Sequence, residues 1–384
     1  MAALAAVKKS DEGRPGLGPK SRTCAKHLED GTRLRTLSHS RAYTQSAPSR
    51  PIMGPAAKPA VSFLGPVASY SHQAVRQVFS EEKWELRPAT TIDDVFDEVQ
   101  GGQAAAGVVP FENSTNGSVV FTLDNLADRE GRYKDITVDG EVFVNVNHCL
   151  LGRRDLNGKP DETNEGSGTC TPTLTDPSPS KPRSKPLGSL RHLQRLYSHP
   201  QAFGQCNAFI STYLKGVDIF EVSSTSKAAE IVSQDRTGTW AAISNSLASS
   251  LHGLDMLGKN IEDREDNTTR FLIISTTTSD GPRNRELRGP PTTKSGSKSM
   301  VSFTVPHTCP GALADALSCF REYNLNLTSI NSRPSLIAPF QYIFFVEFEG
   351  HRRNDPDGRV KGALEKIGQV AHGSRWLGSW ETHR

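Results

Sequence analysis

Strands and capped helices alternate from residue 59 onward, and this alternation restricts the fold more than any other feature. The run PAVSFLGP (59–66) is short, apolar and closed by Gly-Pro, which predicts a strand and a turn. Ser69 or Ser71 can cap the helix that follows. Thr91 stands three residues before Asp94, the spacing of a capping box at the start of a second helix. The alternation predicts an α/β fold with a largely parallel sheet.

The pattern continues to residue 276. We expect a strand in AAGVVPFENS (105–114) that ends at Pro110, and one long strand in GEVFVNVNHCLLG (140–152). Beyond residue 190 the expected elements are a strand at RLYS, a helix through Gln205 to Leu214, a strand at VDIFEV, a helix at STSKAAEIV, and strands at TWAAISN and TRFLIIST.

The last 85 residues or so have a different order. A strand at MVSFTV and a helix at GALADALSCFREY are followed by strands at LNLTSINS and FQYIFFVEFEG, a helix at GRVKGALEKIGQV and a strand at RWLGSW. The order βαββαβ is typical of a ferredoxin-like unit.

Three segments interrupt these patterns. Residues 1–57 carry ten Lys or Arg and four Asp or Glu without an apolar period, which indicates a disordered or targeting head. Residues 153–190 are more than half Pro, Gly, Ser or Thr, which indicates a low-complexity surface insertion. Residues 279–299 are similar and indicate a linker. We therefore expect a first domain at 58–278, which contains the insertion, and a second at 300–381.

Composition excludes several classes of protein. The 45 basic and 42 acidic residues give a net charge of +3, too balanced for a nucleic-acid binder. No apolar run reaches the roughly 20 residues that span a membrane. The six cysteines show no C-x-x-C spacing, which favours reduced thiols in an intracellular protein and gives no metal site.

The stretch LYSHPQAFGQC (196–206) holds possible nucleophiles. Adjacent Ser198 and His199 do not readily serve each other as nucleophile and base, and the chain has no G-x-S-x-G motif. Cys206 lies in an apolar-faced helix, which favours a packing role. His199 precedes Pro200, so we expect it to shape a turn.

Polar clusters follow several predicted strands. They are Ser69-Tyr70-Ser71, Glu112-Asn113-Ser114, Ser198 with Gln205, and Asn267-Thr268-Thr269-Arg270. Ligands of open α/β sheets bind beyond the carboxyl ends of strands, where helix N-termini favour anions. The clusters thus predict a cleft for a small acidic molecule, although each taken singly also fits a cap or turn.

Seven motifs, in order, resemble prephenate dehydratases: FLGPVASYSHQAV, GVVPFENSTNGSV, NHCLLG, LYSHPQAFGQC, STSKAAEIV, AAISN and NTTRFLII. The final block, with PGALADAL and LNLTSINSRP, resembles the ACT regulatory domain of that family. The resemblance implies a two-lobed catalytic domain like periplasmic binding proteins, followed by a ferredoxin-like ACT domain. It covers neither the head nor the two low-complexity segments.

The resemblance also implies roles for single residues. Thr269 is similar to the family's essential catalytic hydroxyl. The implied substrate-binding residues are Glu112, Asn113, Ser114, Ser198, Gln205, Thr268 and Arg270. Arg270 fits a substrate carboxylate and a structural ion pair equally well.

In the final block the resemblance implies a phenylalanine site between ACT domains. Its expected residues are Gly311, Ala312, Leu313, Leu327, Thr328, Ser332 and Arg333. Asn331 stands where the family usually has Glu, so the phenylalanine response can differ here.

The function implied is decarboxylating dehydration of prephenate to phenylpyruvate, without cofactor or metal, in phenylalanine biosynthesis. The implied partners are prephenate and phenylalanine, in a homodimer or homotetramer. We expect a cytoplasmic location, or an organellar one if the head is a transit peptide. An arogenate dehydratase and a non-catalytic amino-acid sensor are the alternatives.

Overall fold

The computed structural model describes residues 58–155, 181–277 and 296–382. The predictions for the head at 1–57 and for most of the linker lie outside these residues. No helix within them is both long and apolar enough to cross a membrane.

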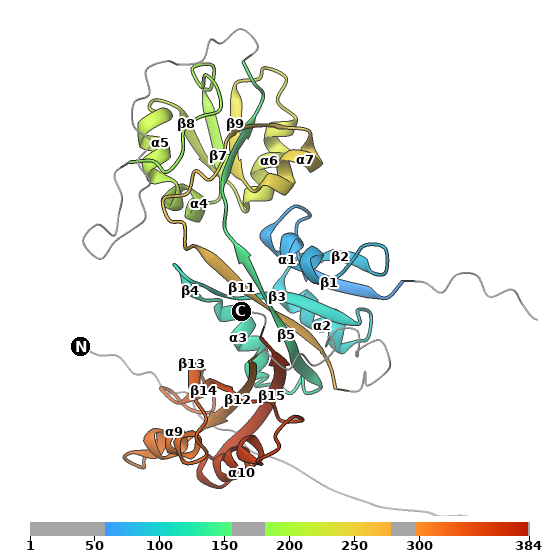
Figure 1. Cartoon of the computed structure of the whole chain (residues 1–384), viewed down its shortest axis with the longest axis vertical. Coiled ribbons are helices and arrows are strands. Elements are labelled where there is room, and N and C mark those ends of the chain that lie inside the picture. Colours follow the sequence, from blue (N-terminus) through green and yellow to red (C-terminus); the bar gives the residue numbers. More distant parts are fainter. Residues whose placement is uncertain (1–57, 156–180, 278–295, 383–384) are drawn as a thin grey trace, which may run out of the picture. The chain divides into compact units, whose positions relative to one another are not determined.

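The first lobe (58–145, with the returning strand 268–276) is built on a mixed sheet (Figure 1). Its elements are β1 (Ala60–Leu64), α1 (Tyr70–Val78), β2 (Glu85–Ala89), α2 (Ile92–Gln100), β3 (Ala106–Asn113), β4 (Gly117–Ser118), α3 (Val120–Ala127), β5 (Ile136–Asn145) and β11 (Thr268–Thr276). Strands β2, β1 and β3 are parallel. Strand β11 lies between β3 and β5 and is antiparallel to both. The expectation of a largely parallel sheet was therefore wrong: β11 returns from the second lobe and so enters the sheet from the opposite end.

The second lobe (146–155 and 181–267) has its own five-stranded sheet in the order β10-β6-β9-β7-β8. Its elements are β6 (Cys149–Gly152), β7 (Arg195–Ser198), α4 (Pro200–Gln205), α5 (Asn207–Tyr213), β8 (Asp218–Glu221), α6 (Thr225–Ser233), β9 (Trp240–Ser244), α7 (Ser246–His252) and β10 (Asp255–Gly258). The two lobes with separate sheets agree with the expected periplasmic-binding-protein-like architecture.

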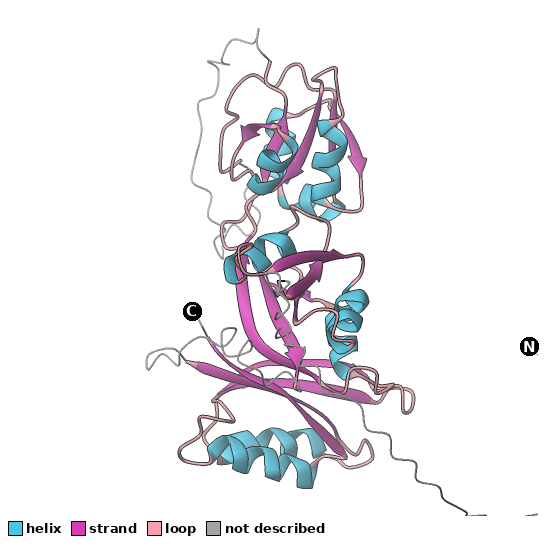
Figure 2. Cartoon of the chain, turned by 90° about the vertical axis from the view of Figure 1, so that its right-hand side faces the viewer, coloured by secondary structure: helices cyan, strands magenta, loops and turns pink. Residues whose placement is uncertain are grey.

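The C-terminal block (296–382) has the expected βαββαβ order. Its elements are β12 (Ser297–Thr304), α9 (Ala312–Glu322), β13 (Leu327–Pro334), β14 (Tyr342–Glu349), α10 (Arg359–Val370) and β15 (Gly373–Glu381). All three pairings within it are antiparallel. Figure 2 shows its two helices side by side on one face of its sheet.

The sheet of the C-terminal block continues into that of the first lobe, because β15 pairs with β5 through Gly378 and Val138. A Cβ atom on Gly378 would lie 2.0 Å from the Val138 carbonyl oxygen, so only glycine permits this approach. Leu377 and Trp380 share one buried cluster with Ile136 of the first lobe. The block is thus packed against the lobe that carries β11.

Three predicted elements differ in the structure. Strand β3 passes through Pro110 to Asn113. The pairing with β1 ends at Val108, and the register with β11 shifts beside Pro110, the kind of irregular site that tolerates proline. The predicted long strand is divided into β5 and β6, which belong to different sheets. The predicted helix to Leu214 is broken at Cys206, where the Asp263 carboxylate accepts from two backbone N–H groups and starts α5.

Only part of the low-complexity segment 153–190 lies within the described residues. Arg183 contacts Glu262 at 2.5 Å, the Leu187 N–H donates to the Leu257 carbonyl, and Leu190 is buried in the core of the second lobe. Residues 181–190 therefore pack on this lobe, which the composition of the segment did not indicate.

Candidate active site

Thr269 lies near the start of β11, in the centre of the first lobe's sheet. It pairs with Asn113 of β3 on one side and with Val144 of β5 on the other. The hydroxyl oxygen of Thr269 accepts a hydrogen bond from the Asn113 side-chain amide, with 3.0 Å between Nδ2 and Oγ1. The structure thus brings together two of the residues predicted from the sequence.

The orientation of the Asn113 amide is fixed by its other contacts. Its Oδ1 accepts from the backbone N–H groups of Thr115 (3.0 Å) and Asn116 (2.9 Å). Its Nδ2 donates to Asn267 Oδ1 at 2.8 Å as well as to Thr269. Since only this assignment gives each atom a complementary partner, the amide nitrogen faces the threonine. The proton of the Thr269 hydroxyl is then not needed for Asn113 and can be donated elsewhere.

Two further predicted residues connect β11 to the loop after β3. The backbone N–H of Thr268 donates to Ser114 Oγ at 2.9 Å, and Ser114 Oγ donates to the Asp266 carbonyl at 2.9 Å. Thr268 Oγ1 donates to Asn145 Oδ1 at 3.0 Å. These contacts fix the position of the strand end that carries Thr269.

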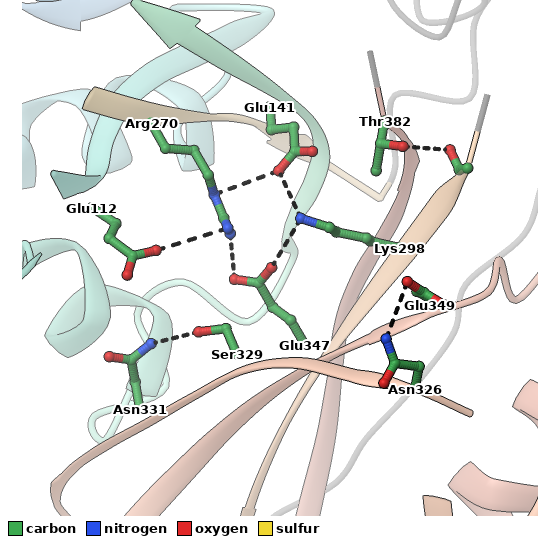
Figure 3. A network of polar contacts seen from close by, with 11 residues as sticks. Glu112, Glu141, Arg270, Lys298, Asn326, Ser329, Asn331, Glu347, Glu349 and Thr382 are labelled. Carbon is green, nitrogen blue, oxygen red and sulfur yellow. Dashed lines mark hydrogen bonds and ion pairs between the residues drawn. The ribbon is translucent and has the colours of Figure 1, made fainter. Parts of the chain in front are cut away.

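Arg270 and Glu112 lie on the opposite face of the sheet from Thr269. Successive side chains of a strand point to opposite faces, and Arg270 pairs in register with Glu112 as Thr269 does with Asn113. The Arg270 guanidinium contacts carboxylates of Glu347, Glu141 and Glu112, as Figure 3 shows. Of the two readings of Arg270, the structure favours the ion-pair partner, because carboxylates of the chain itself surround its charge. Glu112 is likewise separated from the Thr269 face.

The two predicted residues of the second lobe have different surroundings. Ser198 is fully buried, and its hydroxyl donates to the Ile243 carbonyl at 2.8 Å. Its side chain has no exposed surface for a ligand in this conformation, so its contact is structural. Gln205 is half-buried, and its Oε1 lies 2.8 Å from His148 Nε2. His199 caps α4 and Cys206 is fully buried, as expected from the sequence.

His148 joins the two lobes and was not singled out from the sequence. Its Nδ1 lies 3.0 Å from the Tyr70 hydroxyl of α1, and its Nε2 faces Gln205 of α4. Burial lowers the pKa of His148 to about 4, so the ring is neutral at pH 7. In the neutral ring one nitrogen donates and the other accepts, and the Tyr70 hydroxyl beside Nδ1 also donates to the Asn147 carbonyl at 3.2 Å. Burial also raises the pKa of Tyr70, which keeps its hydroxyl protonated as the donor. The sequence did contain a signal for His148: it is a polar residue in the motif NHCLLG, where the chain crosses from one lobe to the other.

The predicted effector residues are all in the C-terminal block. Gly311 has a positive φ of 84° and precedes α9, whose first residue Ala312 is buried. The side chains of Leu327, Thr328 and Ser332 are exposed along β13. Arg333 is held by two contacts to Asp124 of the first lobe, at 2.9 and 2.8 Å.

Asn331, the departure from the family pattern, also contacts the first lobe. Its Oδ1 accepts from Ser118 Oγ at 2.5 Å. Ser118 pairs with Glu112 in the β3–β4 ladder. Strand β13 thus contacts the lobe that carries Thr269.

The family model for prephenate dehydratase matches residues 61–279. A bifunctional chorismate mutase/prephenate dehydratase from Pseudomonas aeruginosa is 34% identical over 83% of this chain and 72% of its own length. A prephenate dehydratase from Methanocaldococcus jannaschii is 30% identical over 76% of this chain and 89% of its own length.

A solved structure gives the same result. The prephenate dehydratase from Arthrobacter aurescens, in complex with L-Phe, matches with a TM-score of 0.65 and 27% identity. The match covers 84% of this chain and 90% of that one, and therefore includes the C-terminal block.

Proposed function

The chain belongs to the prephenate dehydratase family, and we propose that Thr269 is the residue with which it removes the ring hydroxyl of prephenate. The family activity is that of a lyase that forms phenylpyruvate, carbon dioxide and water. In this reaction the bond to the ring carboxylate breaks, its electrons enter the ring, and the C4–oxygen bond breaks on the opposite side. The departing hydroxide takes up a proton and leaves as water.

The contact between Asn113 and Thr269 carries the proposal. A threonine hydroxyl has a pKa far above 7 and is a poor free acid, so its role is to donate a hydrogen bond to the oxygen that is leaving. Because Asn113 donates to the threonine oxygen, it draws electron density from that oxygen and strengthens the donation from its proton. A donor placed where negative charge develops stabilises the transition state more than the ground state. No covalent intermediate is needed, since formation of the aromatic ring drives the reaction.

The two lobes also have a role in this proposal. Tyr70, His148 and Gln205 form a hydrogen-bonded chain from α1 of the first lobe to α4 of the second. A second contact, from Asn245 Nδ2 to the Ala68 carbonyl at 2.6 Å, also joins the lobes. Orientation of a substrate between two lobes depends on such fixed contacts, which reduce the entropy lost on reaching the reactive geometry.

We further propose that phenylalanine regulates the enzyme through the C-terminal block. The similar enzyme from Arthrobacter aurescens binds L-Phe, which supports this assignment. The seven predicted effector residues and Asn331 remain the candidates. The contacts of Asn331 with Ser118 and of Arg333 with Asp124 give an effector on β13 a direct route to the first lobe.

A homodimer or homotetramer formed through the C-terminal block is a further part of the proposal. Strand β13 is the last in its sheet, and an unpaired edge readily adds another strand. Large apolar side chains near this edge are exposed, among them Ile330, Leu336, Ile337 and Phe340. Light scattering on the purified protein measures the oligomer. The cytoplasmic location and its organellar alternative stay predictions.

Product formation by the full chain tests the function. The protein is given prephenate and arogenate separately, with and without phenylalanine, and phenylpyruvate or phenylalanine is measured. We expect phenylpyruvate from prephenate, formed more slowly when phenylalanine is added. Turnover of arogenate alone would keep the mechanism and change the substrate. A folded protein that is stabilised by ligand but turns over neither compound would support the sensor.

A further inference from the structure

Arg270 is the point at which the C-terminal block reaches the catalytic strand. Its guanidinium forms an ion pair with Glu347 of β14, although the two residues are far apart in the sequence. On the first lobe it faces Glu141 at 3.4 Å and Glu112 at 3.9 Å, and it lies over the ring of Phe111 with 4.8 Å from Cζ to the ring centroid. Lys298 of β12 approaches Glu141 at 3.6 Å and Glu347 at 3.9 Å. Figure 3 shows these five charged side chains converging.

This cluster is withdrawn from water. The side chains of Glu141, Glu347 and Arg270 are 1%, 2% and 9% exposed, whereas Glu112 is 38% exposed at the margin. Burial raises the pKa of Glu347, and the nearby charges of Arg270 and Lys298 oppose that rise. Among the described residues no group of three His, Cys, Asp or Glu side chains could hold a metal ion. Arg270 contacts all three carboxylates, and Lys298 approaches the two buried ones.

The local shape of the sheet connects Arg270 to Thr269. The two residues are adjacent in β11, so they share one peptide unit and point to opposite faces. The register with β3 shifts between Arg270 and Phe271, where the extra residue Phe111 stands. Bulges of this kind redirect side chains and are frequent next to active sites. A force on the Arg270 side chain therefore acts on the strand end that presents the Thr269 hydroxyl.

Glu112 competes with Glu347 for the same guanidinium. If Glu347 moved away with β14, Arg270 would retain Glu112 and Glu141 of the first lobe and would be drawn towards them. Glu112 directly precedes Asn113, the donor to Thr269. A displacement of Arg270 thus reaches the Asn113–Thr269 contact through both strands.

We propose that Glu347 and Arg270 are positioning residues for the dehydratase reaction. Through this pair the C-terminal block acts on Thr269 from the opposite face of the sheet. The proposal rests on the role assigned above to Thr269. Neither residue touches the substrate in this account. The pair holds β11 and β3 in the register that places Asn113 against Thr269, and an effector that shifts β14 changes that placement.

The test compares Glu347→Gln with Glu349→Gln in the full chain. Glu349 is on the same strand but exposed, and it accepts from Asn326 at 3.2 Å, so the control makes the same chemical change outside the cluster. We expect Glu347→Gln to lower kcat by roughly ten- to a hundred-fold with KM within about two-fold, as misplacement of a reacting group does. We expect Glu349→Gln to keep the wild-type kcat and KM. Inhibition by phenylalanine weakens in Glu347→Gln alone, since the connection to β14 is lost.

A second readout does not depend on activity. Amide hydrogen exchange at 106–113 and 268–276 is measured in the wild type and both variants, and we expect faster exchange in Glu347→Gln only. If the wild-type protein shows no turnover, the proposed function fails. Amide hydrogen exchange then still tests whether the Glu347–Arg270 pair stabilises β3 and β11. Glu347→Asp keeps the charge on a shorter side chain. If the glutamine variant does not fold, Glu347→Asp takes its place in the kinetic comparison. We expect it to lose less kcat than the glutamine variant would. Equal kinetics and exchange in Glu347→Gln, Glu347→Asp and Glu349→Gln would overturn the proposal.

Discussion

The Asn113 amide donates to the Thr269 hydroxyl at 3.0 Å, across two neighbouring strands that are 156 residues apart in the sequence. Between β5 and β11 the chain runs through the whole second lobe. The contact therefore exists only in the completed first lobe. Under the function proposed above, the two residues have separate, testable roles: Thr269 donates a hydrogen bond to the leaving hydroxyl, and Asn113 polarises the Thr269 hydroxyl.

Replacing Thr269 by valine is expected to remove nearly all turnover. Valine keeps the shape and suits a strand, but it removes the donor to the leaving hydroxyl. Loss of one such donor costs on the order of a hundred- to a thousand-fold in kcat. Steady-state kinetics and a thermal melt of the same preparation measure the effect. Thr269→Ser keeps the hydroxyl and should retain most activity. A valine variant with more than half of the wild-type kcat, and an unchanged melt, would exclude Thr269 as the donor.

Replacing Asn113 by aspartate tests the polarising contact. The carboxylate can still accept from the Thr115 and Asn116 N–H groups, so the loop is kept, but nothing donates to Thr269. We expect kcat to fall by at least about ten-fold, because the threonine then donates to the aspartate rather than to the substrate. Asn116→Asp makes the same chemical change at an exposed neighbouring position and should leave kcat unchanged. Equal effects of the two substitutions would point to net charge as the cause.

The neutral His148 between the lobes predicts a loss of stability in mild acid. An unfolded histidine takes up a proton near pH 6.5, whereas burial lowers the pKa of His148 to about 4 in the folded protein. Between these values the unfolded state binds more protons, so the free energy of unfolding decreases as the pH falls. One pH unit corresponds to about 1.4 kcal/mol, so the loss by pH 4 is on the order of 3 kcal/mol.

Urea denaturation at a series of pH values measures this effect. For each protein the free energy of unfolding is plotted against pH. The contribution of His148 is the slope of the wild type minus the slope of His148→Gln, which lacks the titrating ring. His252→Gln, in the last turn of α7, serves as the control that removes a histidine elsewhere in the second lobe. Parallel curves for the wild type and His148→Gln between pH 6.5 and 4 would contradict the assignment of a buried neutral ring.

Much of the fold followed from local patterns in the sequence. The capping box at Thr91 and Asp94 is present, and the βαββαβ order of the C-terminal block is confirmed. These features depend on neighbours within a few residues, which a sequence displays directly. The antiparallel placement of β11 did not follow, because it depends on where the chain re-enters the sheet.

The candidate site was predictable only in part, for a similar reason. The resemblance brought Asn113 and Thr269 together, and the structure places them in contact. It gave Ser198 a ligand role, but burial against the Ile243 carbonyl is visible only once the second sheet is built. The partner of Arg270 is on another domain, and no spacing in the sequence indicates how β14 docks on β11. Sequence reasoning thus missed contacts that depend on how strands are ordered in a sheet and how domains pack.

Cys206 should be dispensable for turnover. Burial raises the pKa of its thiol, so it carries no thiolate to act as a nucleophile. Cys206→Ala is expected to keep kcat and KM within about two-fold and to lower stability modestly, by about 1 kcal/mol, through a small cavity. Iodoacetamide followed by mass spectrometry gives an independent check. Cys309 is exposed and should be labelled in the native protein, while Cys206 should not. Rapid labelling of Cys206 together with loss of activity would revive the nucleophile hypothesis.

The segment around the low-complexity insertion should divide into a dispensable part and a required part. Replacing residues 156–180 by a short Gly-Ser linker is expected to leave activity within a few-fold. Closing a longer loop costs little additional conformational entropy, so shortening it changes the free energy of unfolding only slightly. Extending the replacement through residue 190 removes Arg183, which contacts the buried Glu262 at 2.5 Å, and the buried Leu190. Removal of one partner from a buried ion pair costs about 3–5 kcal/mol.

Urea denaturation of the two replacements distinguishes these parts, and Arg183→Met in the full chain serves as a matched point variant. Glu262 also accepts from the His148 N–H at 2.7 Å, so its position affects the segment that joins the lobes. We therefore expect the longer replacement and Arg183→Met to lower both stability and kcat, and the shorter replacement to lower neither by much. If both replacements were equally stable and active, residues 181–190 would have no structural role. If both failed to fold, the insertion itself would be required.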